Sequence, residues 1–215
     1  RDDPTRVFRA ARFLARFRQR PAPGMVDEAK AALAAGHAAK LSPHRLLHEF
    51  RSLLGEKNPG PAFKILDAWG YLGLLHPGLP WGKAMPVGVE PRLAALALAL
   101  GLVKGRAFID AFPHEHHLRV LLHEAVALTF SDKAPKTEPS ALAAAAARRA
   151  RPKLPSAALN ICFLHGKDLI KLGFAPGPNF HEILDEAARL QRSGRLKTRA
   201  AALSWLKKII TVDNH

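Results

Sequence analysis

The sequence predicts an all-α protein, an elongated array of many helices without a sheet. Apolar residues recur at intervals of three and four along most of the chain, which is the spacing of one helix face. Alternating β-branched runs bounded by turn residues, which would indicate strands, are missing. Hydrophobic residues make up 48% of the 215 residues, enough to bury a core. We expect three parts, residues 1–76, 77–165 and 166–215.

The first part contains the first expected helices. Asp3 and Pro4 suit the cap and the first turn of a helix that runs to about Gln19. Ser42 and Pro43 begin a later helix in the same way. The proline-rich stretch that follows predicts an ordered turn and the end of this part. The expected helices cover about 4–19, 26–35, 43–54 and 61–75.

The other two parts continue the helical pattern. In the second, an alanine-rich helix is capped by Ser140, and a further helix follows Pro155 and carries Cys162. In the third, turns at 175–178 and 193–194 separate three helices. The expected helices cover about 91–102, 106–112, 116–130, 140–153, 166–172, 179–192 and 198–210.

Charge and cysteine content narrow the function. Lys and Arg outnumber Asp and Glu by 33 to 18, a formal net charge of +15. Such a charge favours a polyanionic partner, either nucleic acid or an acidic membrane surface, with a merely basic globular protein as the alternative. Because the charge is spread over several helices rather than gathered on one amphipathic face, we expect no membrane role. A single cysteine permits no internal disulfide and favours the cytoplasm.

Residue patterns for catalysis are weak. The group His114–His117, followed by His123 and Glu124, lacks the spacing of a typical metal site, so we interpret it as a polar helix start with solvated imidazoles. Motifs of hydrolases, phosphate loops and dinucleotide-binding folds are missing. We interpret Cys162 as a packed thiol on a helix. The tryptophans are assigned to the core: Trp69, Trp81 and Trp205.

Asp3 and Arg6 form a different kind of candidate. One helical turn apart, they can present a carboxylate beside a guanidinium. Cytosine and adenine both show an exocyclic amino donor next to a ring-nitrogen acceptor, whereas guanine and uracil show a carbonyl next to an N–H. The pair therefore matches C and A and rejects G and U. On physical grounds alone, a helix cap is the simpler interpretation of Asp3, and both interpretations stay open.

The surrounding sequence resembles a known family. Residues 2–13, DDPTRVFRAARF, are similar to the nucleotide-selecting segment of class II tRNA nucleotidyltransferases, which comprise bacterial CCA-adding enzymes and poly(A) polymerases. The chain departs from the family at Asp2, where Glu is usual, and at His44, which replaces a common Glu. Further likenesses follow in order: LSPHRLLHEF at 41–50, AWGYLGLL at 68–75 and LGFAPGP at 172–178, then Gly194, Thr198 and Trp205.

The resemblance implies roles for specific residues. Asp3 and Arg6 would select the nucleotide and Arg9 would assist, while Arg45 and Glu49 would brace the neck. The three expected parts would be the neck, body and tail of a longer enzyme whose catalytic head is absent from this chain. That head would hold two Mg²⁺ ions that act on ATP and CTP. This chain alone is therefore expected to hold no catalytic residue and no metal, and to be inactive.

The same resemblance implies that the body and tail bind tRNA at its elbow and acceptor stem, with no specificity for DNA. Helix N-termini at Pro178 and Thr198 would add backbone donors. A solvated basic face is the alternative for each basic cluster. Two other functions stay open: part of a poly(A) polymerase, which the Pro-Gly-Pro segment disfavours, and a headless module that binds structured RNA without chemistry. The expected phosphate contacts are Arg148, Arg149, Arg151, Lys153, Arg192, Arg195, Lys197 and Arg199.

Overall fold

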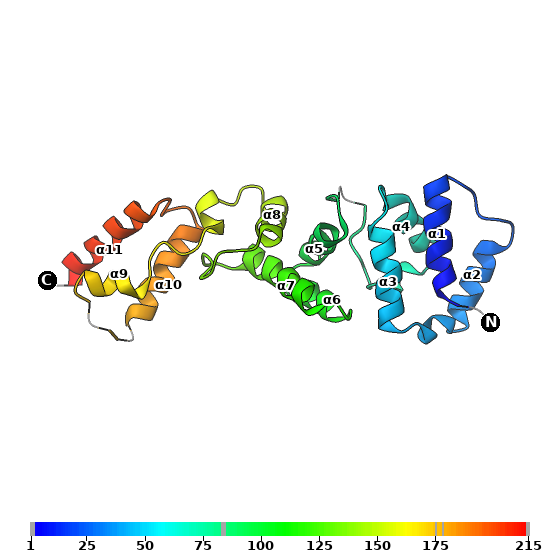
Figure 1. Ribbon diagram of the computed structural model, residues 1–215, viewed down its shortest axis with the longest axis horizontal. Coiled ribbons are helices and arrows are strands. Elements are labelled where there is room, and N and C mark those ends of the chain that lie inside the picture. The colour runs from blue at the N-terminus through cyan, green and yellow to red at the C-terminus, as the bar shows by residue number, and fades with distance from the viewer. Residues whose placement is uncertain (1–2, 83–84, 175, 178, 214–215) are drawn as a thin grey trace. The chain divides into compact units, whose positions relative to one another are not determined.

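The computed structural model describes residues 3–82, 85–174, 176–177 and 179–213, and all regular elements in these ranges are helices (Figure 1). The predicted all-α class is therefore confirmed. The chain divides into two compact units, Arg1–His123 and Glu124–His215. The finer division into three parts stays a prediction.

The first unit is built around α1, α3 and α4, which pack against one another. Its aromatic core centres on Phe50, whose ring meets those of Phe63 and Phe108 edge to face. Trp69 is buried, and Trp81 stacks on Phe63 with ring centroids 6.3 Å apart, as expected for core residues. The elements are α1 (Thr5–Phe17), α2 (Met25–Ala34), η1 (His37–Lys40), α3 (Pro43–Leu54), α4 (Gly60–Ala68), η2 (Leu72–Leu74), α5 (Val89–Ala99), α6 (Leu102–Asp110) and α7 (His116–Phe130), which contains the boundary between the units.

Local sequence signals set several helix ends in this unit. Ser42 caps α3 as expected, with its Oγ accepting from the Arg45 amide at 3.4 Å. The helix expected over about 61–75 is wrong, because α4 ends at Ala68. Gly70 adopts φ +83°, and the Tyr71 amide then donates back to the Leu66 carbonyl at 2.8 Å. This is a glycine-terminated helix end, after which only the short η2 remains.

Helices α5 and α6 pack closely where Gly105 faces α5. A Cβ at this position would lie 2.3 Å from the Ala97 carbonyl oxygen. No side chain fits in this space, so the contact depends on glycine.

The second unit contains the remaining helices and a core of its own. Leu164, Leu169 and Leu206 are buried there, and Trp205 packs against them, as expected of a core residue. Ser140 caps α8 as predicted, with its Oγ accepting from the Ala143 amide at 3.2 Å. The elements after α7 are α8 (Ala141–Ala150), η3 (Ser156–Leu159), α9 (Gly166–Lys171), α10 (Asn179–Arg192) and α11 (Arg199–Asp213).

The prediction that a helix carries Cys162 is wrong. The 3-10 helix η3 directly follows Pro155, and Cys162 lies between η3 and α9, outside any helix. The physical reason is Gln191, a buried side chain of α10. Its Nε2 donates to the carbonyls of Ala157, Asn160 and Ile161 at 2.9–3.1 Å, which a longer helix would use internally.

Two further expectations concern other parts of the chain. The turn at 175–178 includes residues 175 and 178, which lie outside the described residues, as does the helix N-terminus expected at Pro178. Within the ranges that are described, no helix combines the length and apolar character that a membrane crossing requires.

Candidate nucleotide and RNA-binding sites

Asp3 lies just before α1, and two residues hold its carboxylate. Its Oδ1 accepts a hydrogen bond from the Thr5 amide at 3.0 Å, and its Oδ2 accepts one from Arg45 Nη2 at 2.5 Å. The hydrogen bonds from Thr5, followed by the charge of Arg45, lower the pKa of Asp3 from its ordinary value. The carboxylate is therefore ionised near neutral pH and can only accept hydrogen bonds.

The Asp3 carboxylate retains capacity for a ligand. Its side chain is 36% exposed, and each carboxylate oxygen has two lone pairs. Thr5 and Arg45 each occupy one position on a different oxygen. An incoming amino group can therefore use a remaining position without displacing either partner.

Arg45 connects α3 to the residue before α1. It reaches Asp3, which lies 42 residues earlier in the chain, while Glu49 is buried on α3. Among the residues that the structure describes, Arg45 thus ties α3 to the start of α1 and holds Asp3 directly. That Arg45 and Glu49 brace the neck stays a prediction.

Helix α1 displays arginines on the face that its core residues leave free. Phe8 and Ala11 are buried, and the Phe8 ring meets Tyr71 edge to face at 6.0 Å. Arg6 and Arg9 are exposed on the same helix. The structure therefore places the ionised Asp3 at the helix start and two exposed guanidinium groups within the next two turns.

The opposite end of α1 is fixed by Glu56, which follows α3. Its carboxylate accepts from Arg16 at 2.5 and 3.0 Å, and Arg12 Nε lies 3.5 Å away. The Arg12 and Arg16 guanidiniums also lie over the Phe13 ring, at 5.3 and 5.8 Å from its centroid. These two arginines are therefore engaged within the unit.

Most of the basic residues expected to contact phosphates in the second unit are exposed, and some of them also contact other groups of the protein. Arg151 donates to the Thr129 carbonyl at 3.1 Å, and Arg199 contacts Asp168 at 2.6 Å and the carbonyl of Phe163. Both keep part of their side chains at the surface. The exposed members of the expected phosphate-contact set are Arg148, Arg149, Arg151, Lys153, Arg195, Lys197 and Arg199.

The structure contradicts the expectation that Arg192 contacts phosphate. Only 5% of the residue is exposed. Its guanidinium donates to the carbonyls of Leu128 at 2.6 Å, Thr129 at 3.1 Å and Ala158 at 3.0 Å. Burial, and then the nearby charge of Arg151, lower its pKa. Arg192 is a structural residue because its donors are directed into the protein.

Sequence reasoning also missed Arg92, a second buried arginine. It lies on α5, is 5% exposed, and donates to the carbonyls of Leu54, Glu56, Pro86 and Lys57. These carbonyls come mainly from the end of α3 and the residues after it. The only sequence signal was an arginine within a strongly apolar helix.

We expected the imidazoles of the histidine-rich segment to be solvated, and this expectation is wrong for His114. His114 is 7% exposed, and both of its ring nitrogens lack a hydrogen-bond partner. His123 Nε2 instead contacts Asp110 at 2.8 Å, and Glu124 accepts from the Ser140 amide and hydroxyl. Over the described ranges, no group of three or more His, Cys, Asp or Glu residues is placed to hold a metal ion.

Curated proteins with similar sequences identify the relatives of this chain. A CC-adding tRNA nucleotidyltransferase from Deinococcus radiodurans is 34% identical over 203 residues, 92% of this chain and 50% of that protein. A multifunctional CCA protein from Nitrosococcus oceani is 42% identical over 94 residues, 43% of this chain and 23% of that protein. The chain thus matches half or less of the length of these relatives. No family model matches it.

Solved structures show the same fold. A CCA-adding enzyme from Thermotoga maritima, complexed with tRNA, matches with a TM-score of 0.54 at 19% identity. The matched region covers 97% of this chain and 62% of the chain of that enzyme. A CCA-adding enzyme complexed with ATP gives a TM-score of 0.55, also at 19% identity. This match covers 97% of this chain and 61% of the chain of that enzyme.

The charge and the described helices define a basic, all-α protein. The resemblance indicated by the motifs is confirmed. The chain is a relative of the CCA-adding tRNA nucleotidyltransferases.

Proposed function

We propose that this chain is the nucleotide-selecting and tRNA-binding part of a tRNA nucleotidyltransferase that adds CCA, or part of it, to tRNA 3′ ends. One observation carries the proposal: Asp3 is held ionised by Thr5 and Arg45, with Arg6 exposed on the following turn. An acceptor-only carboxylate suits the amino group of C or A, and a guanidinium suits the adjacent ring nitrogen.

The roles of the other residues follow from this function. Arg45 positions Asp3, and Arg9 assists in holding the nucleotide. ATP and CTP are the proposed substrates, and the proposed catalytic Mg²⁺ ions belong to a head that these 215 residues do not supply. A cytoplasmic location fits this role. The names of the relatives favour CCA addition, and they lend no better support to the poly(A) polymerase alternative.

Binding of tRNA is the second half of the proposal. The net charge of +15 and the exposed basic residues at the end of α8 and before α11 support it. Contacts to phosphates read the shape of a folded RNA, which suits a protein that accepts many tRNAs. The proposed contacts are Arg148, Arg149, Arg151, Lys153, Arg195, Lys197 and Arg199, at the acceptor stem and elbow.

A salt series of tRNA binding tests this function. The purified chain is titrated with a tRNA that lacks CCA, with duplex DNA of equal charge as the competitor. We expect tighter binding to the tRNA than to the DNA, with the affinity for both falling as salt rises. Equal affinity for the two would assign the charge to nonspecific polyanion binding and contradict the proposal. A headless RNA-binding module would bind tRNA equally well. Whether the encoding gene contains a catalytic head distinguishes that module from part of a transferase.

A further inference from the structure

The second unit contains a cavity that the proposed contacts do not use. Its volume is about 440 Å³, within the range typical of small-ligand sites. Residues of three segments line it: those after α7, those before α9, and α10. Cys162, the only cysteine of the chain, is among them.

The inner surface of this cavity is apolar, with one aromatic ring. Leu164, Leu184 and Ala188 contribute aliphatic surface, and Phe180 contributes its ring. The ring of Phe180 is fixed edge to face against Phe174, with centroids 6.4 Å apart. A partly buried ring with a fixed orientation offers a surface on which a planar group can stack.

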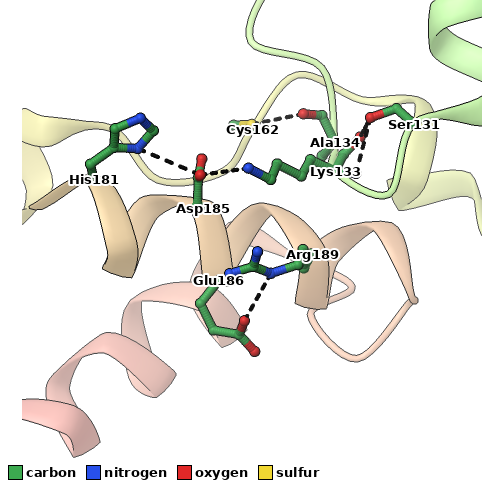
Figure 2. Close-up of polar contacts among 8 residues, drawn as sticks. All are labelled: Ser131, Lys133, Ala134, Cys162, His181, Asp185, Glu186 and Arg189. Atoms are coloured by element: carbon green, nitrogen blue, oxygen red, sulfur yellow. Dashed lines mark hydrogen bonds and ion pairs between the residues drawn. The ribbon is translucent and has the colours of Figure 1, made fainter.

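Cationic and imidazole groups surround this apolar surface. Figure 2 shows Asp185 on α10 between Lys133 and His181, with Lys133 Nζ at 2.5 Å and His181 Nδ1 at 3.5 Å from Oδ2. Asp185 thereby neutralises Lys133. Lys136 and His165 also line the cavity and are exposed. The cavity thus combines an apolar, aromatic interior with net positive charge.

A ligand that matches both properties has a planar, largely apolar body and an anionic group beside it. A nucleotide has this combination, with its base as the planar body and its phosphate as the anion. The chain as a whole carries a charge of +15, which concentrates RNA at its surface. Charge complementarity and the aromatic ring therefore favour a nucleotide of RNA over an acidic peptide or a purely aliphatic acid.

We infer that this cavity binds one unpaired nucleotide of the bound RNA, with its base against Phe180 and its phosphate near Lys136 and His181. The inference rests on the proposed RNA-binding function and adds a specific subsite to it. Binding takes the nucleotide out of its stack, as is usual where proteins recognise single-stranded bases in folded RNA.

Cys162 provides a direct test because it is the single thiol and lines the cavity. The protein is treated with a small maleimide, and the rate of Cys162 alkylation is followed by mass spectrometry with and without tRNA. At a tRNA concentration about ten times its Kd, the rate should fall about tenfold, since roughly one tenth of the protein stays unbound. The tRNA Kd is measured in the same buffer by filter binding.

Control ligands separate the possible sources of protection. A blunt, fully paired RNA helix should bind through its phosphates without protecting Cys162. If it protects as well as tRNA does, surface coverage rather than an inserted nucleotide explains the effect, and the inference fails. Free AMP and CMP should protect Cys162 only at far higher concentrations than tRNA. Protection by these mononucleotides without protection by tRNA would also overturn the inference.

Substitutions give a second readout that does not depend on the thiol. Phe180→Leu keeps an apolar side chain but removes the ring, and we expect about five-fold weaker tRNA binding from the lost stacking. Lys136→Ala should weaken tRNA binding, whereas Lys207→Ala, an exposed lysine on α11 outside the cavity, is the matched control. Unchanged affinity for both Phe180→Leu and Lys136→Ala would contradict the inference.

The design separates the two proposals. If tRNA does not bind at all, the proposed function fails. If tRNA binds with its full salt dependence but Cys162 reacts at an unchanged rate, only the cavity assignment fails.

Discussion

Among the described residues, each unit has one buried arginine, and the two arginines differ in how many hydrogen bonds they make. Arg92 in the first unit and Arg192 in the second are both 5% exposed, and each binds backbone carbonyls rather than a carboxylate. Arg92 holds four carbonyls, three of which belong to the last residue of α3 and the residues after it. Arg192 holds three, of which two belong to the last residues of α7, and its Nε has no partner.

The comparison shows that an arginine in a basic chain need not be a ligand contact. The last carbonyls of a helix have no partner within the helix, and a buried end must find donors elsewhere. A guanidinium supplies five N–H donors in a fixed arrangement, so one side chain can satisfy several carbonyls. The charge of +15 therefore overstates the positive charge available to RNA by at least these two residues.

The largest expected effect is at the more fully bonded arginine. Arg92→Met keeps much of the side-chain volume but leaves four carbonyls without their donor. We expect the free energy of unfolding of the first unit to fall by about 4 kcal/mol. Urea unfolding combined with hydrogen exchange localises the loss to this unit. Arg106→Met, at an exposed position on α6, is the control and should change stability by less than about 0.5 kcal/mol.

Arg192→Met should destabilise the second unit by a smaller amount, about 3 kcal/mol, because one fewer carbonyl loses its donor. The folded variant should bind tRNA with unchanged affinity. Arg195→Met, three residues later and exposed, should show the reverse: unchanged stability, weaker tRNA binding, and a salt dependence reduced by about one released counterion. A loss of tRNA affinity in folded Arg192→Met protein would end the distinction between structural and RNA-binding arginines.

The same contrast shows how far sequence reasoning reaches in this fold. The caps at Ser42 and Ser140 were predicted because a cap involves residues three positions apart. The all-α class was predicted because helical periodicity is also local. Arg92 and Arg192 were not recognised, since their partners lie up to 38 and 64 residues away in the chain. Nothing in the local pattern separates Arg192 from Arg195.

The candidate site follows the same rule. The motif at the start of the chain made Asp3 and Arg6 candidates because they lie one helical turn apart in the sequence, and their role stays a prediction. The contact of Arg45 with Asp3 spans 42 residues and had no local sequence signal. The cavity around Cys162 had no sequence signal, since the fold alone brings its three segments together.

The smallest expected effect is a pH dependence of the stability of the first unit. Burial, and then the charges of Arg51 on α3 and Arg119 on α7, lower the pKa of His114 below its ordinary value of 6.5. The folded state therefore keeps His114 neutral while the unfolded chain takes up a proton. Stability of the first unit is complete above about pH 6.5 and decreases as the pH falls from there toward the lowered pKa of the folded state.

Replacing the imidazole tests this directly. Hydrogen exchange between pH 7.5 and 5.5, above the range in which carboxylates titrate, should show the first unit losing stability as the pH falls. His114→Leu should flatten this loss, because an apolar side chain in the same buried site binds no proton. His117→Leu, exposed one turn later, is the matched control and should keep the slope of the unmodified protein. If His114→Leu keeps that slope as well, the buried imidazole is not the group that couples folding of the first unit to pH.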